Sequence, residues 1–172
     1  TGHGNAAFGV NSLLSNTTGS GNSAFGSYQA GVQYAPLRNN TTGGGNSAFG
    51  VGALQSNTTA NNNSAFGINT LSANTTGASN TAIGTGALQS NITGDENTAV
   101  GRLALYSNTT ASDNVAVGRR ALYSNTSGTN NVALGYQALD ANTTASNNTA
   151  IGYLAGLSNT TGSITALGSF AG

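Results

Sequence analysis

The sequence contains no cysteine, methionine, tryptophan or lysine, and it has a single proline, Pro36. Without cysteine the chain forms no disulfide and no thiolate metal site, which leaves both redox compartments open. Charged residues account for 5% of the chain, against about 25% in an average globular protein. Four arginines balance four acidic residues, so the formal net charge is zero. A nucleic-acid partner is therefore not expected, because binding to phosphates needs clustered cations.

Long apolar runs are missing as well. No stretch approaches the roughly 20 residues that cross a bilayer, so we expect no membrane insertion within this segment. The chain has no signal peptide, and it starts within a repeat without a methionine. We therefore expect a segment of a longer protein, in which residues 1–172 form a single repetitive domain.

A five-residue pattern ending in glycine is present along the whole chain, and residues 80–84 (Asn-Thr-Ala-Ile-Gly) are a complete copy of it. Successive copies are 17 residues apart, except for one interval of 24 and a last one of 16. A short fixed period is typical of a solenoid, and strict periodicity with zero net charge favours order over disorder. The closing glycines are Gly9, Gly26, Gly50, Gly67, Gly84, Gly101, Gly118, Gly135, Gly152 and Gly168.

The two residues before each glycine predict a strand with two different faces. Alanine always stands two positions before the glycine, and a large apolar residue always stands one position before it. Neighbouring side chains of an extended chain point to opposite faces, and we expect both faces to be buried. A single coil has only one inside, so the second buried face predicts an identical neighbouring chain. These core and trimer positions include Ala82, Ile83, Ala99, Val100, Ala116, Val117, Ala133, Leu134, Ala150 and Ile151.

The second half of each repeat is less regular. Apolar residues such as Ile68 and Leu71 are three positions apart, which favours a short α- or 3₁₀-helical turn over a second strand. Asn57 and its equivalents are expected to close this turn in a left-handed conformation. The predicted fold class is mainly β: a parallel β-roll or β-helix of about ten 17-residue coils, each with one short strand and one short helical turn. Because one coil buries few large side chains, we expect assembly as a homotrimeric fibre.

Two coils depart from the repeat. The interval of 24 residues contains seven additional ones, which we place at about 29–35 as an inserted loop before Pro36. In the last copy Ile164 stands where the strand-opening asparagine belongs, and Gly156 stands where other copies have leucine. The C-terminal end is therefore expected to be irregular.

The wording of the repeat resembles known fibre proteins. Residues 97–110 (Asn-Thr-Ala-Val-Gly-Arg-Leu-Ala-Leu-Tyr-Ser-Asn-Thr-Thr) look like a repeat of phage and bacterial fibres. Residues 148–152 (Asn-Thr-Ala-Ile-Gly) are similar to the Ser-Val-Ala-Ile-Gly repeats in the heads of trimeric autotransporter adhesins, whose period is shorter. The resemblance covers essentially the whole chain. It implies a homotrimeric parallel β-fibre, extracellular, on a cell surface or on a virion, that displays or forms an adhesive tip.

Titratable side chains are too few and too scattered to predict an enzyme. His3 has no partner nearby in the sequence, and Asp95, Glu96 and Asp113 occupy the turn before a strand. The acidic column that calcium-binding solenoids need in every coil is absent. We expect no catalytic activity, no metal and no cofactor. A glycan-processing site that uses these three carboxylates across a trimer is the alternative.

An Asn-Thr-Thr column accompanies the repeat. We expect it to form a stacked turn, although its members are formal glycosylation acceptors and a flat threonine array would also suit an ice-binding solenoid. The motif stands at Asn16, Asn40, Asn57, Asn74, Asn108, Asn142 and Asn159, with variants at Asn91 and Asn125.

Side chains that vary between copies are the candidates for binding, because a solenoid keeps its interior constant and varies what faces solvent. Tyrosine and arginine gather at the first, second and fifth positions after the glycine, and their planar groups suit sugars and polar surface ligands. Covering apolar surface or pairing between chains is the alternative role. The predicted partner is a cell-surface glycan or another surface receptor. The candidate residues are Arg102, Tyr106, Arg119, Arg120, Tyr123, Tyr136 and Tyr153, and, in or beside the insertion, Tyr28, Gln33, Tyr34 and Arg38.

Overall fold

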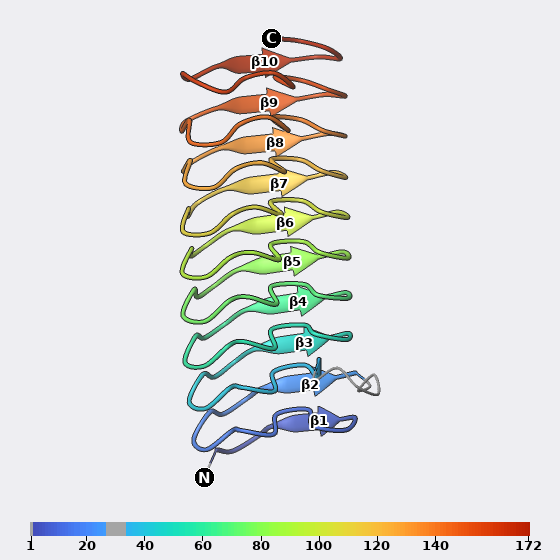
Figure 1. The fold of residues 1–172 in the computed structure, drawn as a ribbon, viewed down its shortest axis with the longest axis vertical. Coiled ribbons are helices and arrows are strands. Elements are labelled where there is room, and N and C mark those ends of the chain that lie inside the picture. Colours follow the sequence, from blue (N-terminus) through green and yellow to red (C-terminus); the bar gives the residue numbers. More distant parts are fainter. Residues whose placement is uncertain (1, 27–33) are drawn as a thin grey trace.

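The computed structural model describes residues 2–26 and 34–172, which form one rod of stacked coils (Figure 1). Ten strands lie in a single parallel sheet, in the order in which they follow one another in the chain. Partners such as Thr81 and Thr98 are one repeat apart, so the predicted parallel solenoid is confirmed. The strands are β1 (Ala6–Phe8), β2 (Ser23–Phe25), β3 (Ser47–Phe49), β4 (Ser64–Phe66), β5 (Thr81–Ile83), β6 (Thr98–Val100), β7 (Val115–Val117), β8 (Val132–Leu134), β9 (Thr149–Ile151) and β10 (Thr165–Leu167).

The segment after each strand is not helical anywhere in the described residues. Alternate residues there take a positive φ, as at Gly50 (φ 128), Gly52 (φ 72) and Leu54 (φ 50). Leu54 N donates to Thr70 O of the next coil at 3.0 Å, so the hydrogen bonds run along the rod. The predicted helical turn is wrong. The left-handed residue expected at Asn57 is Leu54 instead, because this conformation turns the leucine into the coil.

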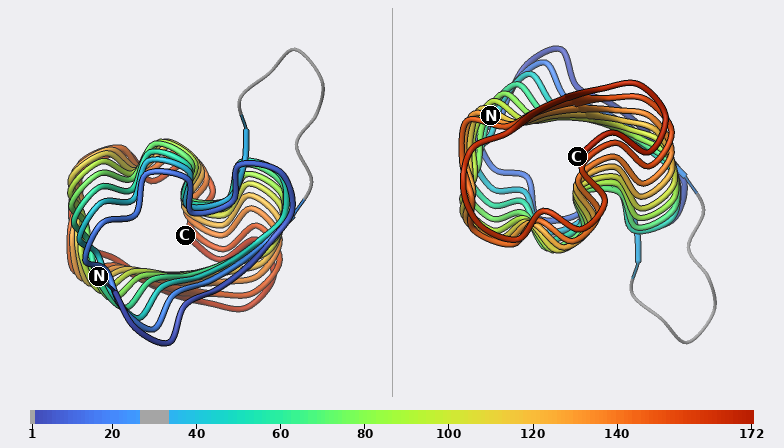
Figure 2. Two further views of the ribbon diagram at one scale, coloured as in Figure 1. Left: turned by 90° about the horizontal axis from the view of Figure 1, so that it is seen from below. Right: turned by 90° about the horizontal axis from the view of Figure 1, so that it is seen from above.

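Residues 2–26 and 34–172 contain no helix long and apolar enough to cross a membrane. Viewed along the rod, the coils lie one above another with a small rotation from each to the next (Figure 2).

Two backbone positions explain the constant glycine and leucine. Gly101 has φ 129, and a Cβ on it would lie 2.7 Å from the carbonyl carbon and oxygen of Gly118 in the next coil. Only glycine fits there. A left-handed leucine costs about 1–2 kcal/mol, which burial of its side chain offsets by about 1.5–3 kcal/mol. The fully buried leucines are Leu37, Leu54, Leu71, Leu88, Leu105, Leu122 and Leu139.

The two faces of the strands differ in burial within one chain. Ala82 is fully buried, in one core cluster with leucines such as Leu88, whereas its neighbour Ile83 is 42% exposed. Within one chain only the alanine face is buried, and the alanines give no evidence for a neighbouring chain because the coil itself covers them. Burial of the other face against a second chain stays a prediction. Ala99, Ala116, Ala133 and Ala150 are likewise fully buried.

The large apolar residues of the strands point outwards in a line that we call the apolar ladder. The rings of Phe25 and Phe49 stack at 4.9 Å, and those of Phe49 and Phe66 at 4.8 Å. These distances match the spacing of neighbouring strands, about 4.7–4.9 Å, so the side chains follow the sheet without distortion. The apolar ladder consists of Phe8, Phe25, Phe49, Phe66, Ile83, Val100, Val117, Leu134, Ile151 and Leu167.

Two columns of buried asparagines form amide ladders along the rod. In the first, Asn91 Nδ2 donates to Asn74 Oδ1 of the preceding coil at 2.9 Å. In the second, the backbone N and Nδ2 of Asn97 both donate to Asn80 Oδ1, at 2.9 and 3.1 Å. The ladders share an acceptor, because Gly94 O accepts from Asn91 Nδ2 at 2.9 Å and from Asn80 Nδ2 at 2.8 Å. The fully buried members are Asn40, Asn57, Asn74, Asn91, Asn108, Asn125 and Asn142 in the first, and Asn22, Asn46, Asn63, Asn80, Asn97, Asn114, Asn131 and Asn148 in the second.

The structural interpretation of the Asn-Thr-Thr column is thereby confirmed. Asn57 Nδ2 donates to Asn40 Oδ1 at 2.8 Å and to Ala60 O at 3.1 Å. The adjacent Thr58 Oγ1 donates to Thr75 O in the next coil at 3.2 Å. Because both amide hydrogens of Asn57 are bonded and its side chain is buried, the folded coil does not present it for glycosylation.

The hydrogen bonds between coils assign the insertion to different residues from those predicted. Gly52 N donates to Tyr34 O at 2.6 Å, just as Asn69 N donates to Val51 O at 2.9 Å one repeat further on. Tyr34 therefore takes the first position after the glycine, and it belongs to the regular coil. The additional residues, predicted at about 29–35, are 27–33 in this register and lie outside the described residues.

The irregular last coil is explained by an exchange of two side chains. A Cβ on Gly156 would lie 2.9 Å from Ile164 Cδ1, so Ile164 fills the space that leucine occupies in other coils. Asn159 Nδ2 then donates to Asn148 Oδ1 at 3.2 Å, and the buried Asn142 Oδ1 is left without a partner. The first amide ladder therefore stops one coil before the last strand.

Replacing Gly156 by leucine is expected to destabilise this end of the rod, because its Cβ would also lie 3.0 Å from Leu139 Cδ2. Adding Ile164→Asn restores the residues of the other coils, and we expect a coupling energy of about 1–3 kcal/mol between the two changes. Amide hydrogen exchange of residues 149–168 in the wild type, both single variants and the pair gives this energy. Additive effects would show that Ile164 does not occupy the leucine space.

Candidate ligand-binding face

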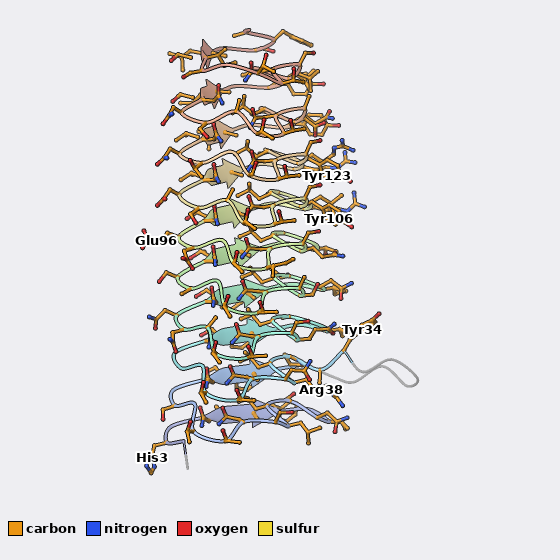
Figure 3. The ribbon with its side chains drawn as sticks, turned by 60° about the vertical axis from the view of Figure 1, so that its left-hand side comes forward. His3, Tyr34, Arg38, Glu96, Tyr106 and Tyr123 are labelled. Carbon is orange, nitrogen blue, oxygen red and sulfur yellow. The ribbon has the colours of Figure 1, made fainter. Side chains whose placement is uncertain are left out.

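The variable side chains lie together along one edge of the rod. Figure 3 shows Tyr106 and Tyr123 on the same side as Tyr34 and Arg38, at the carboxyl ends of the strands, whereas Glu96 lies on the opposite side. This placement follows from the repeat, because equivalent positions of successive coils lie directly above one another. We call the following set the arginine–tyrosine face: Arg102, Tyr106, Arg119, Arg120, Tyr123, Tyr136, Asp140 and Tyr153.

The tyrosines of this face stack on one another along the rod. Tyr106 and Tyr123 have ring centroids 5.3 Å apart with planes inclined by 10°, and Tyr136 and Tyr153 are 5.4 Å apart at 13°. Tyr153 also meets the edge of Phe170 at 5.4 Å. The flat sides of these rings are therefore largely covered by their neighbours. Ring edges and hydroxyl groups remain for contact with a ligand.

Arg120 is held by an ion pair and a ring at the same time. Its Nε lies 2.9 Å from Asp140 Oδ1 and its Nη2 lies 3.0 Å from Asp140 Oδ2, which is a bidentate pair. Its guanidinium carbon lies 4.1 Å from the centroid of Tyr123. The hydrogen bonds to Asp140 raise the pKa of Arg120 further above its ordinary value. Arg120 and Asp140 thus neutralise each other and fix the centre of the face.

The other two arginines of the arginine–tyrosine face, Arg102 and Arg119, have no carboxylate partner among the described residues. Arg119 lies over the ring of Tyr136, with its guanidinium carbon 5.5 Å from the centroid and its Nη1 donating to the tyrosine hydroxyl at 3.4 Å. Arg102 is exposed and makes no ion pair. Within the described part of the chain, the pair of Arg120 with Asp140 is the only salt bridge. Two cations of the arginine–tyrosine face therefore remain available.

The predicted candidate residues form two groups. In the first column Arg119 contacts Tyr136 and Tyr136 stacks on Tyr153, and in the second column Tyr106 stacks on Tyr123. Tyr34 and Arg38 occupy the positions equivalent to Arg102 and Tyr106 four coils earlier, and Tyr28 and Gln33 lie outside the described residues. Sequence reasoning missed the pairing of Asp140 with Arg120 and the contact of Phe170. The sequence contained part of the signal for Phe170. Phe170 is the second residue after Gly168, and Arg120 is the second residue after Gly118, so both occupy the same position of the repeat.

Among the carboxylates considered for catalysis, that of Asp95 binds the backbone. Asp95 Oδ1 accepts from Ala78 N at 2.7 Å, and Asp95 N donates to Ser112 Oγ at 2.9 Å. The backbone N of Asp113, in the equivalent turn of the next coil, donates to Asp95 O at 3.2 Å. Residues 2–26 and 34–172 contain no group of three acidic, histidine or cysteine side chains that could hold a metal, and they enclose no pocket. A ligand on the described surface would therefore lie on an open face.

No family model, curated protein or solved structure matches this chain. The assignment of a function consequently depends on the residues and on the geometry described above.

Proposed function

We propose that this chain is a non-enzymatic segment of a homotrimeric adhesive fibre, outside the cell or on a virion, which binds a cell-surface receptor, in the first place a glycan. The observation that carries this proposal is the division of each coil into a constant interior and a variable outer edge. Such a rod supplies stiffness and reach, and the edge supplies recognition. The resemblance of residues 97–110 to fibre repeats supports the same conclusion.

The apolar ladder supports self-association. One apolar side chain per coil faces solvent in a line along the rod, with Phe66 39%, Leu134 44% and Ile151 39% exposed. A continuous exposed apolar patch of this kind marks an interface, and the fibre resemblance supplies the number three. We expect light scattering of the purified chain to give three times the 16.8 kDa of one chain. A stable monomer would contradict the trimer.

Recognition by the arginine–tyrosine face is tested by binding to a glycan array. We expect the chain to bind, and the variant with Tyr136→Ala and Tyr153→Ala to lose at least about tenfold in affinity, which corresponds to about 1.4 kcal/mol. The matched control replaces Val51 and Ile68 by alanine. These two residues occupy the same position of the repeat as Tyr136 and Tyr153, in coils nearer the N-terminus. Equal losses in both variants would remove this face from recognition.

One observation favours a second candidate, an ice-binding solenoid. The second threonine of the Asn-Thr-Thr motif is exposed in coil after coil, which produces a regular row of hydroxyl groups. Thermal hysteresis in a freezing assay would support this function, and its absence would exclude it. The exposed members are Thr18, Thr42, Thr59, Thr76, Thr93, Thr110, Thr144 and Thr161.

A further inference from the structure

We infer that the arginine–tyrosine face binds an acidic polysaccharide, which it recognises by ion pairs and hydrogen bonds and not by stacking. The inference rests on the proposed function and specifies the ligand class of the same face. Three features of the molecule carry it: the distribution of charge, the covered faces of the rings and the open shape of the edge.

The charge of the face is positive because its one carboxylate is already used. Asp140 is bound in both oxygens by Arg120, and its side chain is 13% exposed. Arg102 and Arg119 have no carboxylate partner among the described residues. Glu96 lies on the opposite side of the rod (Figure 3). Two guanidinium groups without a carboxylate partner lie on an exposed edge. Each of them can bind one carboxylate or sulfate group in a bidentate manner.

The stacking of the tyrosines decides against aromatic ligands. Single-stranded nucleic acids bind by laying their bases on exposed aromatic faces. Here Tyr106 covers one face of Tyr123 at 5.3 Å, and the guanidinium of Arg120 lies over that ring at 4.1 Å. Hydroxyl groups and ring edges are what the stacked tyrosines offer, and these form hydrogen bonds with a polyhydroxylated chain. A sugar polymer with acidic groups fits both the free cations and the free hydroxyls.

The open shape of the edge favours a polymer over a single sugar. No pocket encloses a ligand within the described surface, and small ligands bind in concave sites that bury most of their surface. The face instead repeats one coil at a time from Arg102 to Tyr153, with the rings parallel. A repeating ligand that lies along the rod meets two guanidinium groups and then two tyrosines in successive coils, and several contacts together compensate for the weakness of each one.

The test measures binding of the full chain to four immobilised polymers: alginate, chondroitin sulfate, neutral dextran and polyglutamate. We expect binding to at least one of the two acidic polysaccharides, and at least about tenfold weaker binding to dextran and to polyglutamate. Binding to the acidic polysaccharide is expected to weaken as salt rises to about 0.15 M and beyond, because exposed charges are screened over about 8 Å there.

Variants of opposite sign sharpen the test. Arg102→Gln with Arg119→Gln removes both free cations and is expected to weaken binding about tenfold, because solvent screening reduces the contribution of each exposed charge-assisted hydrogen bond. Asp140→Asn releases Arg120 and is expected to strengthen binding. The control, Asn62→Asp with Asn147→Asp, lowers the net charge equally, at the turn position that Asp113 occupies in its own coil. It is expected to leave binding unchanged.

The outcomes separate the two levels of the proposal. Equal binding of dextran and alginate, or binding that the two arginine changes do not alter, would overturn the acidic ligand while leaving a glycan-binding fibre in place. Equal binding of polyglutamate would show that charge alone is recognised and would overturn the saccharide. If neither these polysaccharides nor a glycan array bound the chain, the proposed function would fail together with the inference.

Discussion

Replacing Asn97 by aspartate is expected to unfold the middle of the rod at neutral pH. Asn97 is fully buried, and its Nδ2 donates to Asn80 Oδ1 at 3.1 Å and to Ala111 O at 2.8 Å. Its Oδ1 accepts from the backbone N and Nδ2 of Asn114, at 3.1 and 3.2 Å. A carboxylate keeps the acceptor but puts a second charged oxygen against two oxygens. We expect a loss of about 3–5 kcal/mol at neutral pH, as for other unpaired buried charges.

The same variant is expected to become more stable as the pH falls. Burial and the two facing oxygens raise the pKa of the new carboxyl above its unfolded value of about 3.9. The folded state then binds more protons than the unfolded state, so its stability decreases as the pH rises through this range. Once protonated, the carboxyl donates one hydrogen bond again.

Thermal unfolding followed by circular dichroism between pH 4 and pH 8 checks this expectation. The control is Asn147→Asp, an exposed left-handed position (φ 59) on the solvent side of a turn, where we expect a change within about 0.5 kcal/mol. A stable Asn97→Asp variant at pH 7, or one whose stability rises with pH, would show that the amide ladder does not support the rod.

Polar substitution in the apolar ladder is expected to abolish assembly. Ile83→Asn with Ile151→Asn removes two apolar contacts from every subunit, and each buried side chain of this size contributes about 1.5–3 kcal/mol to an interface. Summed over three subunits, this loss converts the trimer to monomer at micromolar concentration. Sedimentation velocity measures the change in mass.

The coil itself is expected to survive these changes, because both side chains point away from the interior. Circular dichroism of the variant should match that of the wild type. The control is Ile68→Asn, a residue that is 52% exposed and lies outside the apolar ladder; we expect it to leave the trimer intact. Loss of assembly in this control, or a trimer that persists in the ladder variant, would place the interface elsewhere.

A large part of the fold could be predicted from the repeat. The 17-residue spacing of the glycines led to parallel strands in register, because stacked coils must place equivalent residues above one another. The structural role of Asn57 and its equivalents followed in the same way, since a column of buried amides bonds to itself. The column of Arg102, Arg119, Tyr136 and Tyr153 also needed only the spacing, and neighbouring members of it from Arg119 onward are in contact.

The sequence was less informative about direction and conformation. Alternation in Ala82 and Ile83 shows that a strand has two faces, but it does not say which face is inside. Hydrophobicity suggested that both were buried, whereas the coil encloses the methyl group and leaves Ile83 outside. The apolar spacing of Ile68 and Leu71 indicated a helical turn, yet Leu71 is left-handed with φ 50. Local preference opposes that conformation, and only the packing of leucine into the interior makes it favourable.

The ion pair between Arg120 and Asp140 at the candidate site could not be predicted from the sequence either. Arg120 and Asp140 are 20 positions apart, a distance that differs from the repeat, so no column joins them. Their contact arises because the turn places the second and fifth positions of neighbouring coils side by side. The repeat of the amino-acid sequence thus determined which residues stack along the axis of the rod. The path of the chain around the axis decided which residues face inward, which face outward and which meet between columns, since that path depends on all the turns together.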